Sequence, residues 1–334
     1  MSTSPECESP RGMTGLVPGM STAENYRRFA RQEAAGRSPK YAALAEAVAD
    51  DALVLGFLNA LPPDKRQPNL LFAAARYLLN SPPTLDLLHT FVMQMPSVLT
   101  DVMTSRRTQT NEAGRCAVLL PALAQIPGPL ALLEVGASAG LTLLPDKYSY
   151  DYAGHEIRGN DPLAPVLSCE PRGPVPLPAE VPNVVWRTGI DVNPLDINNT
   201  NDLEWLSCLI WPGNEERSQR LHAAAETARR EPPTVHRGDL LDDLERVASE
   251  VPDDTTLVIY HSAVLAYVDE ETREKFATAV TDLGAVWLSN EAPGVLPGTD
   301  IDSSNGFVLV RDGSEVLART DPHGAWTEWL ARDC

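Results

Sequence analysis

The arrangement of apolar and polar residues changes once along the chain, near Gly128-Pro129. Before this point, apolar residues recur every three or four positions, which is the spacing of helices with one buried face. No segment there alternates with the two-residue period of a strand. The sequence therefore predicts a helical N-terminal domain over residues 21–127, preceded by a disordered tail over residues 1–20. Its helices are expected at 22–33, 39–48, 51–61, 69–79, 85–95 and 111–125.

After this point, short apolar runs bounded by turn residues alternate with helix-forming stretches, which predicts βαβ units and a parallel sheet. Two runs, Phe307–Arg311 and Glu315–Arg319, meet at Asp312-Gly313 and are typical of a β-hairpin. Residues 128–334 are therefore expected to form an α/β domain with a mostly parallel, seven-stranded sheet that ends in an antiparallel hairpin. The other strands are expected at 130–135, 184–190, 234–237, 256–260 and 285–289, and the helices at 203–210, 215–230, 240–250 and 270–283.

One segment of the second domain, residues 148–182, does not fit this alternation. It begins with Tyr148, Tyr150 and Tyr152 and is rich in proline. Because proline is confined to the ends and edges of regular elements, this segment cannot be a central strand or helix. We expect an inserted flap.

The charge of the chain narrows the classes of partner. Its 334 residues include 27 Lys and Arg against 46 Asp and Glu, a formal net charge of −19. Proteins that bind nucleic acid or anionic membranes usually carry a basic surface, so both partners are disfavoured. A small-molecule partner is expected instead, while the oligomeric state is left open.

Other features of the composition favour a cytoplasmic protein. The five cysteines are widely spaced without a CxxC pair, which fits a reducing compartment better than a disulfide framework. The N-terminus lacks the charged and apolar regions of a signal peptide. No apolar run approaches the roughly 18 residues of a membrane span.

The six histidines form no HxxxH, HxH or HExxH pattern, so no metal site is expected. The basic residues of the helix at 215–230 are expected on a solvated face.

The sharpest chemical signal is the bend after the first predicted strand, Leu132-Leu133-Glu134-Val135-Gly136-Ala137-Ser138-Ala139-Gly140-Leu141. Small residues let a ligand approach the backbone, and a helix after the bend would offer free N–H groups. The pattern is close to the E/D-x-G-x-G-x-G bend that binds S-adenosylmethionine, with Glu134 as the acid and Gly136, Ser138 and Gly140 along the bend. The alternative is a tight turn that only packs a helix on the sheet.

The same residues also match G-x-S-x-G, the nucleophile elbow of serine hydrolases, with Ser138 as the nucleophile. His261 or His323 would then be the base and Asp239 the orienting acid. An α/β-hydrolase places its elbow after several strands, whereas this bend follows the first predicted strand. That position favours the cofactor-binding interpretation.

Acids also end the next two predicted strands. Asp191 follows Gly189-Ile190, where an acid can accept hydrogen bonds from both ribose hydroxyls. Asp239 follows Arg237-Gly238 and could accept a hydrogen bond from an adenine amino group. Each acid could instead cap the turn or helix that follows it.

Polar residues at two further places complete the candidate site. Tyr260 and His261 end the fourth strand, where His261 is a candidate general base. A buried, hydrogen-bonded histidine is the alternative. Asn111 and Arg115 lie in a polar stretch before the first strand and could line a ligand pocket or cap a helix.

Several of these motifs together resemble a bacterial family known as domain of unknown function 2332. They are Arg106-Arg107-Thr108-Gln109-Thr110-Asn111-Glu112, the Glu134–Leu141 bend, Tyr148-Ser149-Tyr150-Asp151-Tyr152, Trp205-Leu206 with Trp211-Pro212, Tyr260-His261-Ser262-Ala263-Val264-Leu265 and Asp321-Pro322-His323-Gly324. The resemblance extends from about Tyr26 to Leu330 and implies no particular reaction.

From about Leu130 onward, the chain also resembles class I S-adenosylmethionine-dependent methyltransferases, which implies a Rossmann-like sheet. Glu134, Gly136 and Gly140 match that family's first motif, Asp191 its ribose acid and Asp239 its adenine-side acid. The sequence departs from the family at Ser138 and in the long insertion. The resemblance implies methyl transfer from S-adenosylmethionine to a small molecule. A serine hydrolase and a non-catalytic adenosyl- or nucleotide-binding protein are the alternatives.

Overall fold

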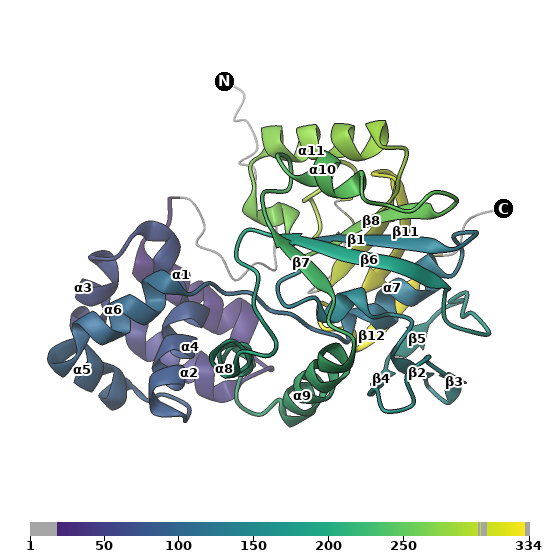
Figure 1. The fold of residues 1–334 in the computed structure, drawn as a ribbon. Coiled ribbons are helices and arrows are strands. Elements are labelled where there is room, and N and C mark those ends of the chain that lie inside the picture. Colours follow the sequence, from purple (N-terminus) through teal and green to yellow (C-terminus); the bar gives the residue numbers. More distant parts are fainter. Residues whose placement is uncertain (1–18, 300, 302–305, 331–334) are drawn as a thin grey trace, which may run out of the picture. The chain divides into compact units, whose positions relative to one another are not determined.

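The computed structural model of the protein describes residues 19–299, 301 and 306–330, and the chain divides into two compact units (Figure 1). Unit 1 comprises the chain up to Thr110 together with Glu204–Glu215, and unit 2 comprises Asn111–Leu203 and the chain from Glu216 onward. The tail expected over residues 1–20 lies, up to residue 18, outside the described residues. No described helix is long and apolar enough to cross a membrane.

Unit 1 is helical, as its apolar spacing predicts. Its core is an aromatic cluster in which Tyr26, Phe29 and Tyr41 pack around Phe72, with Trp211 against Phe29 and Tyr41. One helix was not predicted, and it begins with Pro96 in its first turn, where the missing N–H leaves no bond unmade. The elements are α1 (Thr22–Arg28), the π-helix η1 (Phe29–Ala34), α2 (Pro39–Ala49), α3 (Ala52–Asn59), η2 (Pro63–Lys65), α4 (Pro68–Leu79), α5 (Leu85–Gln94), α6 (Pro96–Ser105) and most of α8 (Thr200–Leu209).

Unit 2 contains a large, mostly parallel sheet in the order β7-β6-β1-β8-β9-β10-β11-β12-β5. The pairs from β7 to β9 are parallel, and those from β9 to β12 are antiparallel. The expected C-terminal hairpin is confirmed as β10 and β11. The strands are β1 (Leu130–Val135), β5 (Glu170–Arg172), β6 (Val184–Asp191), β7 (Thr234–Arg237), β8 (Thr256–Ser262), β9 (Val286–Glu291), β10 (Phe307–Arg311), β11 (Glu315–Thr320) and β12 (Trp326–Trp329).

The sheet has nine strands, so the expectation of seven was wrong. The two additional strands are β12 and its parallel partner β5, which comes from the Pro-rich segment. Strand β5 lies at the edge of the sheet, where Pro171 needs no N–H for a second neighbour.

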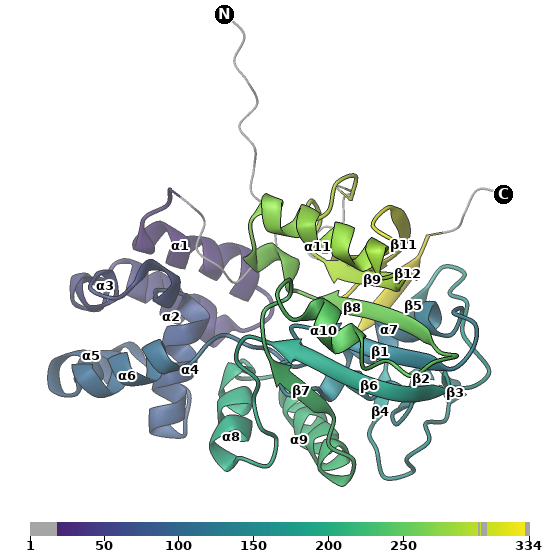
Figure 2. The same ribbon diagram turned by 45° about the horizontal axis from the view of Figure 1, so that its top comes forward.

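Helices cover both faces of this sheet (Figures 1 and 2). On one face, Leu119 and Leu123 of α7 pack with Leu130 and Leu132 of β1. On the other face lie α10 and α11, where Phe276 of α11 contacts Trp287 of β9. The α-helices of this unit are α7 (Arg115–Leu123), α9 (Glu215–Arg230, from Glu216 on), which precedes β7, α10 (Leu244–Ala248) and α11 (Glu270–Asp282). The helix α7 belongs to unit 2 although the sequence grouped it with the helical segment.

The connection from β1 to β6 lacks the α-helix that the sequence predicted after the bend. Only the three-residue 3₁₀ turn η3 (Leu141–Leu143) follows β1. Pro145 explains the difference, because a proline disfavours helical geometry in the residue before it, and Leu144 has φ −114° and ψ 37°.

A small sheet in the order β3-β2-β4 occupies the rest of this connection, made of β2 (Ser149–Tyr152), β3 (His155–Ile157) and β4 (Val166–Ser168). Three buried tyrosines fix this small sheet to the rest of unit 2. Their hydroxyls donate to backbone oxygens, from Tyr148 to Leu141, from Tyr150 to Pro145 and from Tyr152 to Ala117.

The turn at Asp321–Gly324 packs directly on the start of α7. A Cβ on Gly324, which has φ +86°, would collide with the backbone oxygen of Gly114. Gly284 has a similar φ of +64°, but nothing lies within 4 Å of the place of its Cβ.

These two glycines form a matched pair for a test of this contact. Gly284→Ala is expected to cost about 1–2 kcal/mol for its left-handed backbone. Gly324→Ala should cost a further 1–3 kcal/mol or so, because the backbone must also move. Urea unfolding of the two variants measures the difference, and equal losses would contradict the close contact.

Candidate functional site

The carboxyl ends of β1, β6, β8 and β9 lie side by side in the sheet, at the edge where open α/β sheets bind ligands. The bend Gly136–Gly140 follows β1 there. Four of its five amides donate within the protein: those of Gly136 and Ala137 to the backbone oxygen of Ile190, that of Ser138 to Asp191 and that of Gly140 to Ala137. A ligand at this bend would therefore meet side chains more than these N–H groups.

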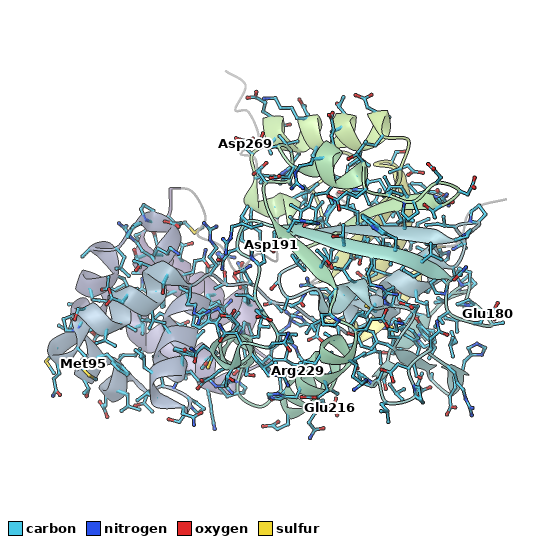
Figure 3. The ribbon with its side chains drawn as sticks, viewed as in Figure 1. Met95, Glu180, Asp191, Glu216, Arg229 and Asp269 are labelled. Carbon is cyan, nitrogen blue, oxygen red and sulfur yellow. The ribbon has the colours of Figure 1, made fainter. Side chains whose placement is uncertain are left out.

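Asp191 lies at the end of β6 (labelled in Figure 3), where it contacts both the bend and the turn that follows its own strand, the cap that the sequence left open as an alternative. Its Oδ2 accepts a hydrogen bond of 2.8 Å from the amide of Ser138, and its Oδ1 accepts one of 2.7 Å from the amide of Asn193. The carboxylate is buried. Asp191 therefore fixes the backbone of the bend at Ser138.

Glu134 lies at the end of β1, beside the bend, and only 4% of its surface is exposed. Its Oε1 accepts a hydrogen bond of 2.5 Å from Thr142 Oγ1, whereas its buried Oε2 has no hydrogen-bond partner. Burial raises the pKa of this carboxyl to about 8, although Thr142 and the charge of Arg115 act in the opposite direction. A buried polar atom without a partner is rare and calls for an explanation.

Ser138 carries a second such atom, because its Oγ is also buried without a partner. The residue has φ +53°, an uncommon backbone geometry for a residue with a side chain. The bend thus places two unpaired oxygens, Glu134 Oε2 and Ser138 Oγ, within four residues of each other along the chain.

Asn111 braces the bend from the segment before α7. Its Nδ2 donates to the backbone oxygen of Ala137 at 3.1 Å, and its Oδ1 accepts from the amide of Leu141 at 2.8 Å. Both ends of the side-chain amide are used by the bend. Asn111, predicted to touch a ligand, thus positions the bend in the structure.

Arg115 lies near the same edge of the sheet. Its Nη1 donates to the backbone oxygen of Ser262, at the end of β8, and its Nε donates to that of Pro322. The side chain is buried, yet no carboxylate lies within ion-pair distance of it among the described residues.

Sequence reasoning missed Glu112. Its carboxylate accepts bonds of 2.7 Å from Arg217 Nε and from Arg220 Nε, both on α9. Burial raises its pKa, but the two arginines outweigh burial and hold the pKa at about 2. The expectation of a solvated basic face on this helix was therefore wrong for Arg217 and Arg220, whose side chains are only 14% and 20% exposed. The signal in the sequence was the spacing of three residues between Arg217 and Arg220, which places both on one face of the helix.

His261 lies on the face of the sheet that α11 covers, in ring contact with Phe276. Its Nδ1 bonds Glu291 Oε1 at 2.7 Å, and its Nε2 accepts from Trp287 Nε1 at 3.0 Å. The ring is 0% exposed. Because both ring nitrogens are engaged, the structure leaves His261 none with which to take a proton from a substrate.

Side chains alternate across a strand, so the neighbour Tyr260 faces α7 together with Glu134. Its hydroxyl donates to the backbone oxygen of Thr142 at 3.0 Å. The structure therefore brings Tyr260 beside Glu134 through Thr142 and places His261 on the opposite face.

The remaining predicted residue, Asp239, lies exposed at the end of β7, where its Oδ1 accepts from the amide of Leu241. This bond belongs to its own turn and does not join Asp239 to the bend. The hydrolase triad is not assembled either, because Ser138 Oγ has no hydrogen-bond partner. Within residues 19–299, 301 and 306–330, no three His, Cys, Asp or Glu side chains gather as metal ligands.

Comparison with known proteins agrees with the motifs of the chain. No curated protein is significantly similar to it. One family model matches residues 23–329, nearly the whole chain, and the matched range contains the bend, Glu112, Asp191 and the turn at Asp321–Gly324. The chain belongs to the family described as "Uncharacterized protein conserved in bacteria (DUF2332)".

Proposed function

We propose that this protein is an S-adenosylmethionine-dependent methyltransferase that acts on a small molecule. The observation that carries the proposal is Glu134 Oε2, a buried carboxyl oxygen without a partner at the end of β1. Burial favours the neutral form of this carboxyl, whereas a cation beside it would favour the ionised form. A positively charged partner would therefore bind to Glu134 more strongly than a neutral one. S-adenosylmethionine carries such a charge on its sulfonium.

Three residues in or beside the bend fit S-adenosylmethionine. Glu134 would face the positive charge of the sulfonium, and Ser138 Oγ, which is also unpaired, would supply a hydrogen bond. Asp191, at the end of the neighbouring strand, already contacts the bend and would accept hydrogen bonds from the ribose hydroxyls. When bound, S-adenosylmethionine supplies an electrophilic methyl group. Asn111 and Asp191 hold the bend rigid, so this chain contributes mainly positioning and charge.

Isothermal titration calorimetry with S-adenosylmethionine and S-adenosylhomocysteine tests the proposal. Both ligands are expected to bind the unmodified protein. Glu134→Gln should weaken S-adenosylmethionine about tenfold or more and S-adenosylhomocysteine less, because only the first carries a sulfonium charge. Glu170→Gln, at an exposed and distant edge strand, is the matched control and should change neither affinity.

Three results would contradict the proposal in different ways. Absence of binding at millimolar ligand removes the cofactor. Labelling of Ser138 by a fluorophosphonate probe, lost in Ser138→Ala, assigns a serine hydrolase. Binding without methyl transfer to any member of a small-molecule acceptor panel assigns a non-catalytic adenosyl-binding protein.

A further inference from the structure

We infer that Arg115, Arg217 and Arg220 form a binding site for the carboxylate or phosphate group of a small molecule. Arg217 and Arg220 both pair with the carboxylate of Glu112, and Arg115 lies three residues after Glu112, where the charges of Glu112, Glu291 and Glu134 act on it. The three arginines and Glu112 all belong to unit 2.

Each arginine keeps hydrogen-bond donors that the protein does not use. Arg217 and Arg220 reach Glu112 only through Nε, so the terminal nitrogens of both make no hydrogen bond within the described residues. Arg115 uses Nε and Nη1 on backbone oxygens and leaves Nη2 without a bond. None of these nitrogens is among the fully buried unpaired atoms, so each retains some access to solvent.

The charge around Glu112 is not balanced. Two guanidinium groups, those of Arg217 and Arg220, share one carboxylate in a protein whose net charge is −19. Arg115 faces two further acids, Glu291 and Glu134. Glu291 therefore offsets the charge of Arg115, and the excess of positive charge lies at Arg217 and Arg220, which share the single carboxylate of Glu112. Desolvating cations is costly unless an anion meets them, and the planar guanidinium matches carboxylate and phosphate oxygens.

The cluster also lies beside the bend. Asn111, which braces the bend, directly precedes Glu112, and Arg115 bonds the backbone at the end of β8, the strand next to β1. If the proposed methyl transfer holds, on which this step rests, the anion is the anchoring group of the methyl acceptor. The acceptor is then a small molecule that carries a carboxylate or a phosphate.

Titration with inorganic phosphate and, separately, with succinate tests the site and distinguishes the two anions. Binding is followed by calorimetry and by the melting temperature at constant ionic strength, with sodium chloride as the ionic control. We expect saturable binding of at least one anion and a higher melting temperature, which sodium chloride does not reproduce. Arg217→Gln and Arg220→Gln should each weaken that binding about tenfold, whereas Arg246→Gln, in an exposed ion pair, should leave it unchanged.

Arg217→Lys keeps the charge next to Glu112 and serves if a glutamine variant does not fold. Its binding should be weaker than that of the unmodified protein, because an ammonium lacks the planar fork. Absence of saturable binding of both anions, or binding that the substitutions at Arg217 and Arg220 leave unchanged, would overturn the site. Neither titration contains S-adenosylmethionine, so failure of the anion site is distinct from failure of the proposed cofactor.

Discussion

Glu112→Gln is expected to lower the free energy of unfolding by about 3 kcal/mol at pH 7. The pKa of Glu112 is about 2 in the folded protein and about 4.5 when exposed, so its ionised form stabilises the fold. This stabilisation is fully present above pH 4.5 and is lost as the pH falls from 4.5 toward 2. Glutamine removes the charge and leaves Arg217 and Arg220 facing a neutral amide.

Urea unfolding at pH 7 and at pH 3.5 measures this effect. The difference between Glu112→Gln and the unmodified protein should be smaller at pH 3.5, because the carboxylate has then lost part of its advantage. Glu170→Gln is the control, since Glu170 pairs with Arg172 at an exposed edge strand. A difference of equal size at both pH values would show that the loss does not come from the charge of Glu112.

Glu134→Gln is expected to do the opposite and to stabilise the protein at alkaline pH by about 5 kcal/mol. Burial raises the pKa of Glu134 from 4.5 to about 8, so the folded state binds this proton more tightly than the unfolded state does. The fold is therefore destabilised progressively as the pH rises from 4.5 to 8. Glutamine keeps the shape and the bond from Thr142 but cannot ionise.

Unfolding free energies at pH 5 and pH 8.5 test this second prediction. The two proteins should be similar at pH 5, and the glutamine variant should be more stable at pH 8.5. The same variant should bind S-adenosylmethionine less well, which would identify Glu134 as a residue retained at the expense of stability. A stability difference that does not change with pH would contradict the raised pKa.

The sequence was sufficient for the elements whose signal is local. The apolar run at 130–135 coincides with β1, and Asp312-Gly313 correctly placed the hairpin of β10 and β11. The pairing of β5 with β12 could not be predicted, because it joins Glu170 to Trp326 and neither run is strongly apolar. The small residues of the bend predicted a helix after it, but Pro145 disfavours helical geometry in the residue before it, and only a 3₁₀ turn forms.

The residues of the candidate site also differ in whether a local pattern predicts them. Glu134 and Asp191 were recognised because an acid at a strand end is visible in a single segment, and the structure joins Asp191 to the bend. Glu112 was missed because its partners lie 105 and 108 residues further along the chain. The face of the sheet that His261 occupies could not be read from a single segment, and Trp287 of the neighbouring strand takes the nitrogen that a base would need.

The contact between the start of α7 and the turn at Asp321–Gly324 has a consequence for synthesis on the ribosome. Arg115 and its partner Pro322 are 207 residues apart, and Gly114 rests against Gly324 near the C-terminal end of the described chain. Unit 1 can begin to fold while translation continues, because its first segment ends at Thr110. The segment that braces the bend must wait until Pro322 and Gly324 have been synthesised, so a nascent chain that stalls before them carries an unfinished site.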